Sequence, residues 1–242
     1  MTRLSINVNK VALIRNARGG DLPNLEKFCQ NLLSLDVDGL TVHPRPDARH
    51  ITLSDVEMLK SITESHSAEL NIEGNPTDAF IDFVCAIQPD QCTLVPDKPG
   101  QLTSDHGWNL EHNAQRLQEV ILKLHTYNIR VSLFMDADVS QYAFLGDLGI
   151  DAVELYTGPY AHDYSLRGDA ACDKLEESVS ALRSLGLDIH AGHDLNLQNL
   201  APLVRAYPDI KEVSIGQAFV ADCLYFGVEN THGLYQRAIS MI

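Results

Sequence analysis

The sequence predicts a single (β/α)8 TIM barrel with additional helices, which occupies residues 1–242 as one catalytic domain. Eight short apolar runs alternate with segments of helical period, as expected for repeated β/α units. The length of 242 residues is close to the roughly 250 residues of a typical TIM barrel. No stretch rich in Gly, Pro or Ser divides the chain. An open doubly wound sheet is the alternative, but no G-x-G-x-x-G motif follows the first apolar run.

The eight strands are predicted at 4–9, 39–43, 69–74, 92–96, 130–136, 152–157, 187–192 and 212–217. These runs are almost continuously apolar, which is typical of parallel strands buried on both faces. Helices are predicted between them at 24–35, 52–63, 109–127, 171–186, 197–207 and 226–242. Ser54 and Glu57 have the spacing of a capping box, and Gly186 is placed to end the fourth of these helices. The segment 97–108, DKPGQLTSDHGW, is predicted to be a long lid or binding loop.

Charge and composition exclude several classes of partner. The formal net charge is −15, so nucleic acid and anionic membranes, which require a basic surface, are not expected partners. A small phosphorylated molecule remains possible where a few Arg and Lys side chains converge. The first twenty residues lack the apolar core of a signal peptide, and no apolar run reaches the roughly 18 residues of a membrane span. The five scattered cysteines form no C-x-x-C motif, so we expect a cytoplasmic protein.

Polar residues recur where the predicted strands end, and the active site of a TIM barrel lies at that end. His43, Glu73 and His193 follow the second, third and seventh strands. Two imidazoles and a carboxyl suit proton transfer near neutral pH, and partial burial would raise the pKa of Glu73. Two alternatives stay open: His43 could be a structural histidine, and Glu73 could pair with an arginine. Asp136 and Asp138 are predicted to cap the helix that follows them.

An anion pocket and a metal site are the two candidate binding sites. Arg18, Arg45 and His50 could bind phosphate, and the turn at Gly216 places a helix N-terminus after the last strand. Arg15 is interpreted as ordinary surface charge. His, Asp and Glu at strand ends could also hold a divalent ion. However, no strand ends in H-x-H, no H-E-x-x-H occurs, and the nearby arginines would repel a cation. A metal-free acid–base site is therefore favoured.

Several segments occur together in an order that resembles a known family. They are RNARG, TVHPRPDARHI, NIEG, TLVPD, VSLF, ELYTGPYA, AGHDL and SIG. Across nearly the whole chain they are similar to the pyridoxine 5′-phosphate synthase family of vitamin B6 biosynthesis. The resemblance implies a TIM barrel that assembles as a homo-octamer and needs no cofactor or metal. It also implies condensation of 1-deoxy-D-xylulose 5-phosphate with 3-amino-2-oxopropyl phosphate, which gives pyridoxine 5′-phosphate, phosphate and water.

The resemblance also implies roles for individual residues. His43 and Glu73 resemble the family's acid–base residues, and His193 resembles its proton donor. The residues that resemble those holding the deoxyxylulose phosphate are Arg45, His50 and Thr103. Those that resemble the site of the amino-ketone phosphate are Asn7, Arg18 and Gly216.

Three departures from the common family pattern involve four residues. Many members have Asp-His where this chain has Asn9-Lys10, and Gly where it has Asp194, although a branch of the family shares both features. The third is Gln217, which stands where the pattern has His; it can donate a hydrogen bond to phosphate but carries no charge. Asn9, Lys10, Asp194 and Gln217 are all predicted to bind substrate. Asp194 is predicted to bind the amine of the amino-ketone phosphate. A metal-dependent barrel isomerase or hydrolase, or an inactive barrel that binds a sugar phosphate, are the alternatives.

Overall fold

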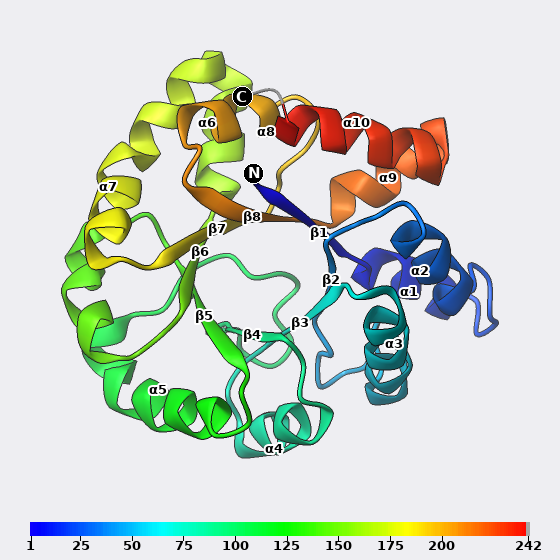
Figure 1. Ribbon diagram of the computed structural model, residues 1–242, viewed down its shortest axis with the longest axis horizontal. Coiled ribbons are helices and arrows are strands. Elements are labelled where there is room, and N and C mark those ends of the chain that lie inside the picture. Colours follow the sequence, from blue (N-terminus) through cyan, green and yellow to red (C-terminus); the bar gives the residue numbers. More distant parts are fainter. Residues whose placement is uncertain (241–242) are drawn as a thin grey trace.

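The structure is a computed structural model that describes residues 1–240. Eight parallel strands form a closed barrel in chain order, because the last strand pairs with the first (Figure 1). The strands are β1 (Arg3–Asn7), β2 (Gly39–Val42), β3 (Glu69–Gly74), β4 (Gln91–Leu94), β5 (Arg130–Met135), β6 (Ala152–Tyr156), β7 (Asp188–Gly192) and β8 (Ile210–Ile215). The predicted TIM barrel is confirmed, and every predicted strand overlaps the observed one.

Helices surround the barrel in Figure 1 and cover the outer face of the strands. They are α1 (Asn9–Asn16), α2 (Leu25–Leu33), α3 (Leu53–His66), α4 (Asp78–Ile87), α5 (Leu110–His125), α6 (Gly158–Arg167), α7 (Glu176–Leu185), α8 (Leu200–Ala206), α9 (Gln217–Phe226) and α10 (Val228–Ser240). Two 3-10 segments, η1 (Val139–Asp147) and η2 (Gly168–Leu175), complete the set. The six predicted helices are confirmed as α2, α3, α5, α7, α8 and α10. Residues 241–242 of the last prediction lie outside the described residues.

The structure corrects several predicted boundaries. The first strand was expected to reach Asn9, but it ends at Asn7, and Asn9 begins α1. Asn9 and Lys10 are therefore in the first turn of a helix. The prediction for 171–186 was wrong in extent, because η2 occupies its first part and α7 starts at Glu176. Segments α1, α4 and α6 were not predicted, since each is short and begins within a few residues of a strand end. The helix start predicted at Gly216 is confirmed as that of α9.

The residues predicted to cap the helix ends were right in two cases and wrong in one. The capping box of α3 consists of Thr52 and Asp55, not Ser54 and Glu57. Asp55 accepts a hydrogen bond from the N–H of Thr52 at 2.8 Å, and Thr52 accepts one in return at 3.2 Å. Gly186 does end α7, with a φ of 73°. Asp138 caps η1 as predicted by accepting a hydrogen bond from the N–H of Ser140 at 3.0 Å.

The lumen of the barrel is polar. Leu, Ile and Val side chains of the strands are buried in the hydrophobic core, whereas alternate positions carry buried polar groups. Ser5 and Thr41 share a hydrogen bond of 2.7 Å, and Thr93 donates to Asn71 at 3.1 Å. Gln91 of β4 lies 3.5 Å from His190 of β7, across the barrel. The strands are buried on both faces as predicted, but one of those faces is hydrogen-bonded rather than apolar.

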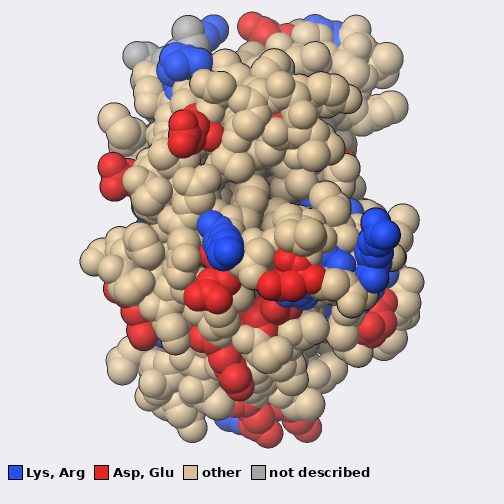
Figure 2. Space-filling view, turned by 90° about the vertical axis from the view of Figure 1, so that its right-hand side faces the viewer, with Lys and Arg blue, Asp and Glu red and all other residues tan. Residues whose placement is uncertain are grey.

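The surface and the helix lengths bear on possible partners. Within residues 1–240, no helix combines the length and the apolar character needed to span a membrane. On the face shown in Figure 2, Lys and Arg side chains are interspersed with Asp, Glu and uncharged residues. This face therefore offers no broad basic patch of the kind that binds nucleic acid.

Candidate active site

A cavity of about 480 Å³ opens at the end of the barrel where the strands finish. Every residue predicted for the site except Arg18 lines it. Those residues are Asn7, Asn9, Lys10, His43, Arg45, His50, Glu73, Thr103, His193, Asp194, Gly216 and Gln217. They end or follow six of the strands, β1, β2, β3, β4, β7 and β8, so barrel closure brings together side chains that are far apart in the sequence.

His43 and Glu73 form an acid–base pair in the floor of this cavity. His43 Nδ1 lies 3.7 Å from Glu73 Oε2, and the two side chains are 6% and 13% exposed. Burial, together with the charge of Arg45, lowers the pKa of His43 well below its usual value. Burial and the charge of Asp97 raise the pKa of Glu73 to about 8. Near pH 7 the pair is therefore uncharged, with His43 able to accept a proton and Glu73 able to donate one.

Two asparagines position this pair. The N–H of His43 donates to Asn9 Oδ1 at 3.0 Å. The amide of Asn7 donates to Glu73 Oε2 at 3.5 Å, while its oxygen accepts from the N–H of Asn9 at 3.1 Å. The first turn of α1 is thereby tied to β2 and β3. Asn9, predicted to bind substrate, makes a structural contact to the backbone of His43.

Glu154 of β6 is a third carboxyl in the cavity, and sequence reasoning gave it no role. It lines the cavity and is 5% exposed. Burial and the charge of Glu73 raise its pKa well above the usual value. A Cβ at Gly192 would overlap Glu154 Oε1, so the glycine makes room for this carboxyl. The available signal was a single charged residue inside the apolar run AVELY, because an unpaired charge beside a barrel core is costly.

The buried carboxyl of Glu73 predicts a pH-dependent stability difference. Because its folded pKa is raised, the wild-type protein keeps a proton that the unfolded chain loses above about pH 4.5, so stability falls as pH rises toward 8. Glu73→Gln removes this loss. We expect its free energy of unfolding, relative to wild type, to increase between about pH 5 and pH 8 by on the order of 1 kcal/mol or more.

Urea denaturation of both proteins across this range measures the difference. Subtracting the wild-type value removes the opposing contribution of His50 and His190, whose pKa values are lowered by burial. A difference that stays constant with pH, or shrinks as pH rises, would contradict the assignment of a protonated Glu73.

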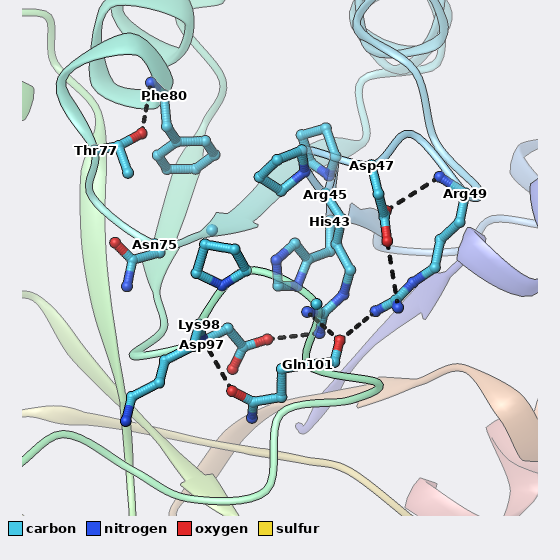
Figure 3. Close-up of a pocket in the computed structure, with 15 residues that line it drawn as sticks. His43, Arg45, Asp47, Arg49, Asn75, Thr77, Phe80, Asp97, Lys98 and Gln101 are labelled. Atoms are coloured by element: carbon cyan, nitrogen blue, oxygen red, sulfur yellow. Dashed lines mark hydrogen bonds and ion pairs between the residues drawn. The ribbon is translucent and has the colours of Figure 1, made fainter.

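Arg45 and His50 provide hydrogen-bond donors on one wall of the cavity. The Arg45 guanidinium, 9% exposed, donates to Asp97 at 2.5 Å and to the carbonyl of Gln101 at 3.2 Å (Figure 3). His50 Nδ1 accepts the N–H of Ile51 at 2.9 Å, so the neutral ring carries its proton on Nε2. Burial, with the charge of Arg49, lowers the pKa of His50 to about 4. This wall therefore combines a cation with a neutral N–H donor.

The loop 97–108 lies over the same wall. Arg49 donates to the carbonyls of Gln101 and Leu102 at 2.6 and 2.9 Å, and it forms an ion pair with Asp47 at 3.5 Å. Ser104 donates to Asp97 at 2.8 Å. A second cavity of about 420 Å³ borders this loop and shares His43, Arg45 and Arg49 with the first (Figure 3). Two arginines thus hold the loop in place beside the cavity.

Another wall consists of the turn between β8 and α9, on the far side of β1 from β2. Gly216 is the N-cap residue of α9, and a Cβ there would lie 3.2 Å from the Cβ of Asn7. The first N–H groups of a helix have no intrahelical partner and attract anions. Gly216 and Gln217 line the cavity at this wall. The arrangement offers a second anion-binding position, separate from Arg45 and His50.

The turn after β7 holds His193 in a backbone conformation that residues other than glycine rarely adopt. His193 and Asp194 have φ angles of 87° and 57°. The hydroxyl of Thr157 donates to the carbonyl of His193 at 2.6 Å, and the amide of Asn199 donates to that of Asp194 at 3.1 Å. Both donors are buried. The hydrogen bonds offset part of the cost of a left-handed backbone, which a glycine at position 194 would adopt without strain.

The structure corrects the interpretation of the RNARG segment. Arg18 is exposed and does not line the cavity, so a role on substrate requires movement of its segment or a second copy of the chain. Arg15, interpreted as surface charge, is instead 13% exposed and donates to both carboxylate oxygens of Asp55 at 2.6 and 2.8 Å. Asn16 donates to the carbonyl of His50 at 2.7 Å. Arg15 and Asn16 therefore support the segment that carries His50.

No cluster of three or more His, Cys, Asp or Glu side chains suited to a metal ion occurs within residues 1–240. The titratable groups of the cavity are instead interleaved with arginines. A metal-dependent site gains no support from the donor set that the barrel brings together.

Comparison with known proteins identifies the family. The family model described as "Pyridoxal phosphate biosynthesis protein PdxJ" matches residues 4–241. The chain belongs to the PdxJ family. Pyridoxine 5′-phosphate synthase from Parabacteroides distasonis is 45% identical over 240 residues, which cover 99% of this chain and 100% of that protein. The enzyme of the same name from Cytophaga hutchinsonii is 46% identical and covers 99% of both chains.

A more distant likeness concerns the fold alone. Thiamine phosphate pyrophosphorylase from Pyrococcus furiosus superposes with a TM-score of 0.62 at 10% identity, covering 98% of this chain and 95% of that one. At such low identity the comparison adds no information on chemistry. The resemblance drawn from the sequence segments is confirmed by the PdxJ match and by these relatives, whose names are those of an enzyme.

Proposed function

We propose that this PdxJ-family chain is a pyridoxine 5′-phosphate synthase. It condenses 1-deoxy-D-xylulose 5-phosphate with 3-amino-2-oxopropyl phosphate to give pyridoxine 5′-phosphate, inorganic phosphate and water. One observation carries the proposal most directly. A single cavity contains two anion-binding walls, with an uncharged acid–base pair between them. The names of relatives at about 45% identity support the same activity.

The two walls match the two phosphate groups of these substrates. We assign the sugar phosphate to Arg45 and His50, where a guanidinium and a neutral N–H can both donate to phosphate oxygens. We assign the amino-ketone phosphate to the first turn of α9 at Gly216 and Gln217. Anchoring both phosphates brings the amine of one substrate to the carbonyl of the other and replaces a bimolecular encounter by an oriented one.

The cavity floor supplies the proton transfers. Attack of the amine on the ketone, loss of water to form the imine, loss of phosphate, addition of water at the carbon that the phosphate leaves, and ring closure with loss of further water each move a proton. The overall reaction requires no net oxidation or reduction, so acid–base groups suffice. His43 accepts and Glu73 donates in their resting states, and His193 lies across the cavity as a further proton donor. Burial raises the pKa of Glu154 well above its usual value, which favours the protonated form that can donate a hydrogen bond.

Purified, chelator-treated protein supplied with both substrates tests the proposal. We expect release of inorganic phosphate together with the absorbance and mass of pyridoxine 5′-phosphate. Activity that disappears only on chelation would instead favour a metal-dependent barrel enzyme. Binding of the sugar phosphate without product would favour an inactive barrel.

We further propose that the chain forms a homo-oligomer, and the resemblance points to an octamer. The end of α9 exposes a group of large apolar side chains: Leu224, Tyr225 and Phe226 are 76%, 81% and 48% exposed. Apolar groups clustered in this way mark contact surfaces. Light scattering of the purified protein gives the mass directly, and a monomer would contradict the proposal. The cytoplasmic location predicted from the cysteines stays a prediction.

A further inference from the structure

The imidazole of His193 is surrounded by three different contacts. Nε2 lies 2.8 Å from the hydroxyl of Thr103, at the tip of the loop 97–108. Nδ1 lies 3.2 Å from Asp194 Oδ2. The ring edge meets Tyr156, with ring centroids 5.2 Å apart and planes at 81°. The ring is therefore held between the strand end and the loop, with one nitrogen toward the carboxylate and the other toward Thr103.

The nitrogen beside Asp194 has no other polar partner among the described residues. Nδ1 is buried and makes no aligned hydrogen bond, so the carboxylate at 3.2 Å is its nearest counterpart. The Asp194 side chain is 58% exposed, whereas its backbone carbonyl accepts a hydrogen bond from Asn199. A small rotation of the carboxylate aligns the pair.

We propose that Asp194 is a positioning residue that keeps the His193 proton on Nδ1, so that Nε2 is the nitrogen that exchanges protons with substrate. This inference rests on the proposed function of the cavity. A carboxylate at one imidazole nitrogen fixes both the tautomer and the ring orientation, because only an N–H can satisfy it. The prediction that Asp194 binds the substrate amine is the alternative that the kinetic test below distinguishes.

The contact at Nε2 is consistent with this assignment. With the ring proton on Nδ1, Nε2 is an acceptor, and the hydroxyl of Thr103 donates to it at 2.8 Å. Thr103 thereby occupies the position that a substrate oxygen or nitrogen takes during turnover. When the protonated ring acts as a donor, the proton leaves from Nε2 to the substrate oxygen, and the second proton stays on Nδ1. Asp194 remains ionised throughout.

Steady-state kinetics separates positioning from amine binding. We expect Asp194→Ala to lower kcat by about 10-fold to 100-fold, a range typical of lost support for a proton-transfer group. The KM for the amine substrate should stay near its wild-type value. Asp194→Glu, which keeps the carboxylate, should recover part of kcat. A raised KM for the amine with unchanged kcat, or no change in either constant, would overturn the inference.

Asp138→Asn is the matched control. Asp138 is an exposed carboxylate at the same end of the barrel, it does not line the cavity, and asparagine retains its capping hydrogen bond. It removes one negative charge without touching His193, and its kcat should equal that of wild type. A loss in Asp138→Asn as large as that in Asp194→Ala would show a general charge effect.

A second measurement does not depend on turnover. Imidazole ¹⁵N signals of His193, assigned by their loss in His193→Gln, report which nitrogen carries the proton in the neutral ring. We expect the Nδ1–H form in wild type and a shift toward Nε2–H in Asp194→Ala. An Nε2–H ring in wild type would overturn the inference, even for a protein that proved unable to form pyridoxine 5′-phosphate. A wild-type protein without condensation activity would overturn only the proposed function.

Discussion

Glu73→Gln is expected to reduce kcat for condensation by about 10²-fold to 10⁴-fold while leaving the barrel folded. Glutamine has nearly the shape of the protonated acid that the raised pKa favours, so the hydrogen bond from Asn7 and the contact with His43 can remain. What is lost is the proton itself, because an amide neither donates nor accepts protons in the required cycle. The substitution thus removes the proton-transfer group while the packing around position 73 is retained.

Circular dichroism and steady-state kinetics on the same preparation measure the two consequences. Glu212→Gln is the matched control, because Glu212 is also a buried glutamate with a raised pKa, of about 7, but it pairs with Arg3 and does not line the cavity. We expect this control to retain activity. Near-normal turnover by Glu73→Gln would show that the acid–base pair has been assigned to the wrong residues.

Arg45→Met has the second large effect, and it acts on binding and on stability together. Removing the guanidinium takes away a phosphate ligand, so KM for the sugar phosphate should rise by about 10-fold to 100-fold or more. It also leaves the Asp97 carboxylate, 4% exposed, without its cation. Breaking one side of a buried ion pair costs about 3–5 kcal/mol of stability.

A double variant separates these two effects. Asp97→Asn in the Arg45→Met background removes the unpaired charge while Ser104 can still donate to position 97. Stability should return toward wild type, and KM for the sugar phosphate should stay high. Recovery of both quantities would mean that Arg45 acts only as a structural partner of Asp97.

The sequence predicted the barrel well because its strands are short, apolar and regularly spaced. Positions such as His43, Glu73 and His193 follow directly from that spacing, since strand ends meet at one mouth. The short helices α1 and α4 were missed because they start immediately after strand ends, where a strand and a helix show similar apolar patterns over a few residues. A boundary error of this kind misplaced Asn9 on a strand.

Which side chains contact one another was harder to predict from the sequence than which residues lie at strand ends. Arg15 and Arg18 lie in one segment, and only the direction of α1 decides that Arg15 reaches Asp55 while Arg18 is exposed. Glu154 was given no role because its burial depends on the space left by Gly192, on the neighbouring strand. Likewise, the contact of Thr103 with His193 spans 90 positions and depends on how the loop 97–108 folds back. Such contacts depend on how distant segments meet in the folded barrel, which the local sequence pattern does not indicate.

The most direct test of the account is a crystal structure of Glu73→Gln with both substrates bound. The account predicts two phosphate groups in the cavity at the end of the barrel. One should accept hydrogen bonds from Arg45 and His50, and the other should lie at the first turn of α9 beside Gly216. The reacting carbon and nitrogen should then lie between them, near His43. Phosphates that share one wall, or a substrate bound outside this cavity, would contradict the account.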